Sequence, residues 1–96
     1  MFPGLTTKLS EATVASTTTI DVKTDVILLT GSTAIAELIP HFGGGFSGIV
    51  VLIPLDGTVG LTTAQNISAA VTMAAERSTI LVYSRTEETW YPHALS

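Results

Sequence analysis

The sequence predicts a mainly β domain, a small β-sandwich or barrel with one short helix and an extended N-terminal arm, assembled as a trimer. Three observations predict this fold. Apolar and β-branched residues gather in short runs separated by turn residues. The 96 residues are enough for one hydrophobic core and too few for two. Charged residues make up only 12% of the chain, about half of the roughly 25% usual in globular proteins. We therefore expect neighbouring subunits to cover part of the surface.

The first 18 residues are expected to form the arm, ahead of a β-rich domain at 19–96. Pro3, Gly4 and a run of Ser and Thr at 16–19 favour an extended segment over a helix. The arm's apolar side chains are too sparse for a core, yet an unpartnered tail would be more charged. We expect these side chains to dock on a neighbouring surface: Phe2, Leu5, Leu9 and Val14.

Short apolar or alternating runs predict the strands in the first half of the domain. These segments are 19–23, 26–30, 33–39 and 49–53. The strongest is the unbroken apolar run from Ile49 to Ile53, a pattern typical of a strand buried on both faces. We therefore place Ile49, Val51 and Ile53 in the core.

A capping box predicts the helix. Thr62 stands at the N-cap, and Gln65 follows three residues later. The helix is expected to reach about residue 70, and the composition leaves open whether it continues to Arg77. No segment of the chain repeats at a fixed period, so a solenoid is excluded.

The C-terminal segment has the pattern of a β-hairpin. Strands at 79–84 and 88–91 flank the polar turn 85–87. Trp90 is assigned to the core as an aromatic anchor, and the position of Tyr91 is left open.

Charge and hydropathy exclude two classes of partner. The net charge is −4 with four basic residues, so the chain lacks the basic stripe that nucleic-acid binding requires. The longest apolar run, Ile49 to Leu55, is far below the roughly 18 residues of a membrane span. The N-terminus has no pattern of a secretory signal, so synthesis in a cytoplasm is expected.

Motifs for chemistry are weak, and we expect no enzyme activity, cofactor or metal. Gly43, Gly45 and Gly48 match G-x-G-x-x-G, but they precede a strand instead of following one. Ser47 does not complete the G-x-S-x-G pattern of a nucleophile elbow, because Ile49 occupies one of the two positions that require glycine. The two histidines, His41 and His93, have no acidic partner at a ligand or triad spacing. The acceptor pattern at 66–68 is taken as an accidental match to a glycosylation site.

The order of several short segments resembles a known family over about residues 20–93. The segments are Thr30-Gly31-Ser32-Thr33-Ala34-Ile35, Gly45-Phe46-Ser47-Gly48, Leu52-Ile53-Pro54, Thr62-Thr63-Ala64-Gln65-Asn66-Ile67 and Trp90-Tyr91-Pro92. This arrangement is similar to a small β module of tailed-bacteriophage structural proteins, found in capsid decoration (cement) proteins, head fibres and tail-fibre tips. The chain departs from it at Gln65, where the family has a glycine.

The resemblance implies a trimerising β unit without catalytic activity. It implies a decoration protein on the capsid exterior, with itself and the major capsid protein as partners. On that reading Phe2, Leu5, Leu9 and Val14 contact the capsid or a neighbouring subunit. The alternative is a head-fibre or tail-fibre attachment module that binds host-surface glycans through Trp90, Tyr91 and the glycine loop.

Overall fold

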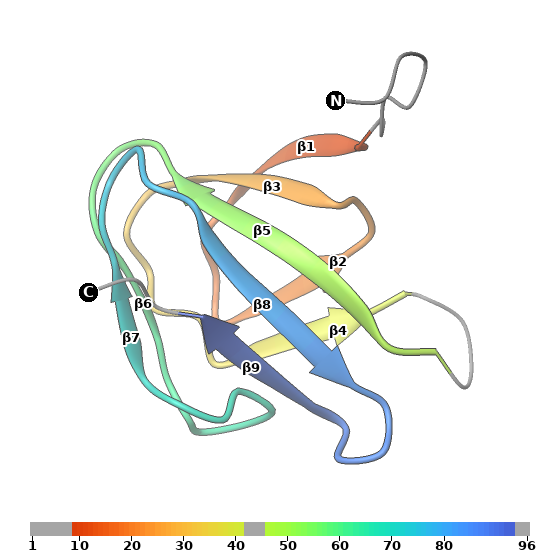
Figure 1. The fold of residues 1–96 in the computed structure, drawn as a ribbon. Coiled ribbons are helices and arrows are strands. Elements are labelled where there is room, and N and C mark those ends of the chain that lie inside the picture. The colour runs from red at the N-terminus through yellow and green to blue at the C-terminus, as the bar shows by residue number, and fades with distance from the viewer. Residues whose placement is uncertain (1–8, 42–45, 94–96) are drawn as a thin grey trace.

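A computed structural model describes residues 9–41 and 46–93, which form an all-β domain (Figure 1). Its strands are β1 (Glu11–Ala15), β2 (Thr19–Val22), β3 (Val26–Thr30), β4 (Glu37–Pro40), β5 (Gly48–Pro54), β6 (Val59–Leu61), β7 (Val71–Met73), β8 (Thr79–Ser84) and β9 (Thr89–His93). A five-stranded sheet, called the large sheet below, has the order β1-β3-β5-β8-β9. Two small sheets, β2-β4 and β6-β7, accompany it. The predicted mainly β class is confirmed.

The chain winds back and forth between the large sheet and the β2-β4 sheet. β1, β3 and β5 are parallel neighbours in the large sheet, while β2 and β4 are parallel to each other. Glu11 lies opposite Val26, 15 residues on, and Val26 lies opposite Val51, 25 residues on. Because successive turns of the winding differ in length, they leave no fixed period in the sequence. The described chain therefore contains no repeated unit of fixed length, as the absence of a sequence period predicted.

The predicted hairpin is confirmed. β8 pairs antiparallel with β9, and β8 also pairs antiparallel with β5, which makes the large sheet mixed. The hairpin turn ends at Glu88, whose φ of 52° lies in the left-handed region. The hairpin thus adds two strands to the same sheet that the parallel winding begins.

The predicted helix at 62–70 is absent, and no helix occurs in the described parts of the chain. Tertiary pairing takes the backbone groups that a helix would use. Trp90 donates its backbone N–H to the carbonyl of Asn66, and Ser68 donates to the carbonyl of Trp90. A capping box contributes only about 1 kcal/mol, so these long-range bonds and the burial of Ile67 prevail. The strand predicted at 33–39 is shorter than expected, because regular pairing begins at Glu37.

Part of the predicted arm belongs to the domain's own sheet. Glu11 to Ala15 pair in parallel with β3, so the boundary at residue 18 does not separate an arm from the body. Val14 is half-buried and packs against the core of its own chain, while its contact with the capsid or a neighbouring subunit stays a prediction. Leu9 is 57% exposed. Phe2 and Leu5 lie outside the described residues.

The core lies on the inner face of the large sheet. Val50 and Leu52 are fully buried on β5, whereas Ile49 is 55% exposed and Val51 and Ile53 are half-buried. The assignment of Ile49, Val51 and Ile53 to the core was therefore wrong in register. Successive residues of a strand face opposite sides of the sheet. The small sheets cover only the side to which Val50 and Leu52 point. Trp90, also assigned to the core, is 0% exposed.

Candidate functional site

The outer face of the large sheet carries apolar side chains that no other element of the described chain covers. We call this set the outer sheet face: Val26, Leu28, Ile49, Val51, Ile53, Ile80, Val82 and Tyr91. Strand register aligns its members in rows across the sheet. Val26, Val51 and Ile80 form one row. Ile49, Val82 and Tyr91 form another, and Leu28 lies opposite Ile53.

Four of these eight side chains are exposed to solvent, and the other four are half-buried. Ile49 is 55% exposed, Val82 is 44% exposed and Tyr91 is 43% exposed, and these three adjoin across β5, β8 and β9. Ile80 is exposed to a similar degree, and the members on β3 are half-buried by their neighbours. The four exposed members therefore lie on the adjacent strands β5, β8 and β9 instead of being scattered singly over the surface.

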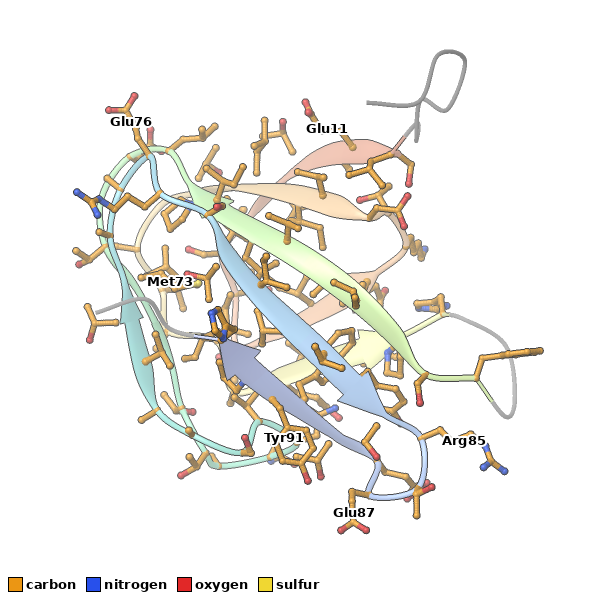
Figure 2. The ribbon with its side chains drawn as sticks, in the orientation of Figure 1. Glu11, Met73, Glu76, Arg85, Glu87 and Tyr91 are labelled. Carbon is orange, nitrogen blue, oxygen red and sulfur yellow. The ribbon has the colours of Figure 1, made fainter. Side chains whose placement is uncertain are left out.

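Formal charge is confined to the margin of the outer sheet face. Glu11 extends the Val26 row at the β1 edge, and His93 extends it at the β9 edge. Figure 2 shows Glu11, Glu76, Arg85 and Glu87 at the periphery of the large sheet. An apolar centre with a polar rim is the arrangement typical of protein–protein interfaces.

The physical effect available to this face is desolvation. Covering apolar surface contributes about 25 cal/mol per Å² removed from water, and the aliphatic members bring no titratable group to the face. Because β-strands hold these side chains in fixed rows, little backbone entropy is lost when a partner covers them. The face is therefore suited to packing against another surface, not to bond-making chemistry.

Hydrogen bonds from Asn66 and Trp90 to Leu38 join the segments on the inner side of the large sheet. The sequence did not predict them. The Asn66 side chain accepts a hydrogen bond from the Leu38 N–H at 3.0 Å and donates one to the Leu38 carbonyl at 2.7 Å. The Trp90 Nε1–H donates to the same carbonyl at 2.9 Å. The Asn66 side chain thus supplies Leu38 on β4 with the donor and the acceptor that a neighbouring strand would otherwise provide. Sequence reasoning weighed it only as a glycosylation acceptor, because its partner is 28 residues away.

The candidate catalytic and ligand residues do not converge. His41 lies 3.6 Å from the Asp21 carboxylate, and both side chains are about half exposed. The Ser47 hydroxyl accepts a hydrogen bond from the Arg85 backbone N–H. Within residues 9–41 and 46–93, no group of three or more His, Asp or Glu side chains is positioned to hold a metal ion. Gly43 and Gly45 lie outside the described residues.

The two adjacent aromatic residues point to opposite sides of the sheet. Trp90 is fully buried and lies 5.1 Å from the Tyr83 ring, centre to centre, while Tyr91 is exposed. A glycan platform made of both rings would need both faces in solvent. Only Tyr91 is available, and its row neighbours Val82 and Ile49 offer no hydrogen-bonding side chain for sugar hydroxyls.

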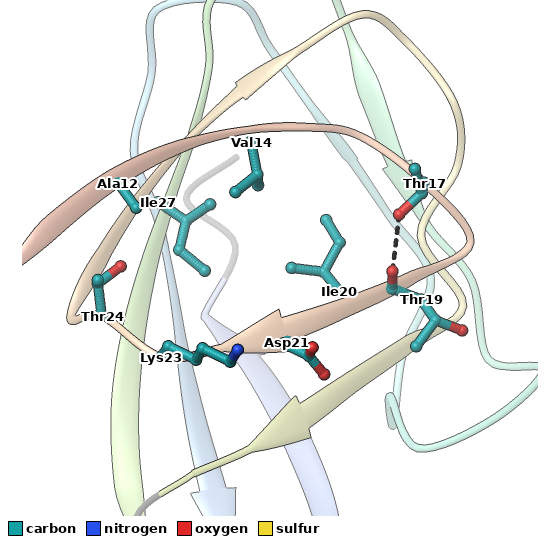
Figure 3. Close-up of a pocket in the computed structure, with 9 residues that line it drawn as sticks. All are labelled: Ala12, Val14, Thr17, Thr19, Ile20, Asp21, Lys23, Thr24 and Ile27. Carbon is teal, nitrogen blue, oxygen red and sulfur yellow. Dashed lines mark hydrogen bonds between the residues drawn. The ribbon is translucent and has the colours of Figure 1, made fainter.

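A separate hollow of about 310 Å³ opens between β1 and β2 (Figure 3). Ala12, Val14, Ile20 and Ile27 supply its apolar walls. Polar residues complete the lining: Thr17, Thr19, Asp21, Lys23 and Thr24. The hydroxyl of Thr17 donates to the Thr19 carbonyl, so part of this rim is already engaged within the chain.

Comparison with known proteins gives no relative: no family model, curated protein or solved structure matches the chain. The described residues also contain no helix long and apolar enough to cross a membrane.

Proposed function

We propose that the protein is a structural subunit of a tailed-bacteriophage virion. In this proposal it is a capsid decoration protein that forms homotrimers, binds the major capsid protein on the capsid exterior and stabilises the shell. It performs no catalysis and uses no cofactor. The proposal combines the family resemblance of residues 20–93 with one structural observation, the uncovered outer sheet face.

The outer sheet face supports a subunit that works in an assembly. Ile49, Val82 and Tyr91 would lie in water on an isolated chain, at a cost of roughly 25 cal/mol for each Å² of apolar surface. A second protein surface removes that cost. The low share of charged residues, 12%, has the same explanation, because a surface covered by other subunits needs fewer charges for solubility.

The mechanism in this proposal is static. Many copies bind the shell, and each bound copy stabilises the assembled state over the dissociated one by mass action. Covering apolar rows that are already in place requires no conformational change. Glycan attachment is the less favoured alternative, because Trp90 is buried and Tyr91 has aliphatic neighbours.

Light scattering of the purified full chain tests the trimer. We expect a mass of three chains at micromolar concentration. Val82→Asp, which places a carboxylate at the centre of the outer sheet face, should shift the population to monomers. Ile39→Asp is the matched control, because Ile39 is 36% exposed on β4, outside the large sheet. A stable wild-type monomer near 10.0 kDa would contradict the proposed trimer.

Co-sedimentation with expanded capsids tests the partner. The wild type and the Ile39→Asp control should pellet with capsids that lack their decoration protein. If the wild type forms trimers but stays in the supernatant with every phage shell tested, the capsid assignment is wrong. Binding to immobilised host glycans that is lost in Tyr91→Ala would favour the attachment module.

A further inference from the structure

We infer that the open end of the winding, at β1 and β2, binds residues 1–8 of a second copy of this chain. This inference rests on the self-association in the proposed function and names a contact that links the copies. It concerns a different surface from the outer sheet face.

β1 and β2 both end their sheets on the same side. β1 has β3 as its sole strand neighbour, and β2 has only β4, among the residues that the structure describes. One more turn of the winding, placed before β1, would pair with both free edges. Parallel windings need a cap at such an end, because exposed strand edges invite pairing with another chain.

The end of the domain at β1 and β2 contains a hollow with apolar walls. Figure 3 shows Val14, Ile20 and Ile27 directed into the space between β1 and β2. Ile20 and Val14 belong to the first turn of the winding, so the hollow opens onto the core itself. β1 also lacks the proline and lysine that commonly protect edge strands, whereas β9 at the opposite edge contains Pro92.

The chemistry of residues 1–8 suits this hollow. Residues 1–8 offer two large apolar side chains after the initial Met, Phe2 and Leu5, and one charge, Lys8. The charged residues that line the hollow are one acid, Asp21, and one base, Lys23. An extended segment with mainly apolar side chains and a single charge therefore fits a hollow with apolar walls and a polar rim of balanced charge.

The path of the chain at Ser10 favours a second copy as the binding partner over the same chain. Val26 donates its N–H to the Ser10 carbonyl, and the Ser10 N–H bonds the Asp25 carboxylate, so the chain already runs in line with β1 at Ser10. Folding back along β1 would require a tight turn at Lys8 and Leu9. Neither residue favours the positive φ that such hairpin turns need. Extended, eight residues span at most about 26 Å, which limits how far from β1 the second copy can lie.

Disulfide trapping tests this contact, because the chain contains no cysteine. Two full-length single variants, Phe2→Cys and Lys23→Cys, are mixed under mild oxidation, and the mixed disulfide is quantified by mass spectrometry. Phe2→Cys mixed with Thr86→Cys is the matched control, since Thr86 is exposed in the β8–β9 turn. A disulfide forms only when the two Cα atoms approach within about 7 Å.

We expect at least about tenfold more mixed disulfide with Lys23→Cys than with Thr86→Cys, because a bound segment has a local concentration far above the bulk value. Equal yields in the two mixtures would overturn the inference. So would a double variant, Phe2→Cys with Lys23→Cys, that closes its disulfide within single chains. If the yields are equal while the wild type is a trimer, the inference fails and the proposed function stands. A wild-type monomer instead contradicts the proposed function itself.

Discussion

The two faces of the large sheet differ in what covers them far more than in what they are made of. On β5, Val50 and Leu52 point inward and are fully buried, while Ile49 points outward and is 55% exposed. Both sets are branched aliphatic residues. Apolar character is therefore common to both faces, and the small sheets on one side decide which face forms the core. In the proposed function, the outer sheet face is the apolar surface that a partner covers.

The largest expected effect is on the inner face, at Trp90. Trp90→Ala should lower the free energy of unfolding by about 3–5 kcal/mol, since the ring is 0% exposed and its N–H bonds the Leu38 carbonyl. Urea unfolding followed by circular dichroism measures this. Tyr91→Ala, one residue away on the outer face, is the control and should cost far less. Equal losses at both positions would break the distinction between the faces.

Two substitutions on β5 compare an inward-facing residue with an outward-facing residue of the same strand. Leu52→Ala should cost about 2–5 kcal/mol, because it opens a cavity in the core. Ile49→Ala should cost less than about 1 kcal/mol at concentrations where the chain is monomeric. At higher concentration, Ile49→Ala should lose stability relative to the wild type, because association stabilises the folded chain. A cost at Ile49 that is independent of concentration would argue against an interface there.

A substitution at Asn66 tests how much its hydrogen bonds to Leu38 stabilise the inner side of the domain. Asn66→Ala removes two hydrogen bonds to Leu38, and we expect a loss of about 1–3 kcal/mol. Thermal unfolding would measure it, with Gln65→Ala, an exposed neighbour, as the control. Light scattering should show unchanged association, because Asn66 lies away from the outer sheet face. A stable but dissociated Asn66→Ala protein would contradict this separation.

The smallest effect is expected in the hairpin turn. Glu88 has a φ of 52°, which L-residues adopt at a cost, so Glu88→Gly should raise the free energy of unfolding by up to about 1 kcal/mol. The replacement touches neither face of the sheet. A change in association state with Glu88→Gly would therefore show that assembly depends on more than the outer sheet face. Glu87→Gly is the control, and it should be neutral or destabilising.

Local pattern determined the elements whose partners are near in sequence or whose apolar runs are long. The strands at 26–30 and 49–53 and the hairpin of β8 and β9 match the structure closely, because β-branched runs and polar turns specify them without outside help. Trp90 lies in the core, as its chemistry predicted. The low share of charged residues could also be recognised from composition alone, although composition does not locate the uncovered apolar face.

Tertiary structure decided the rest, and in each case the deciding contact is remote in sequence. The capping box at Thr62 and Gln65 was overridden by bonds between Asn66 and residues 38 and 90. Residues 11–15 became a strand because β3 offered them a free edge. The buried side of β5 depended on where the small sheets lie, which an uninterrupted apolar run cannot encode, since both of its faces look alike. A pattern specifies which backbone conformation is favoured, while the energy of covering a face depends on what the rest of the chain places against it.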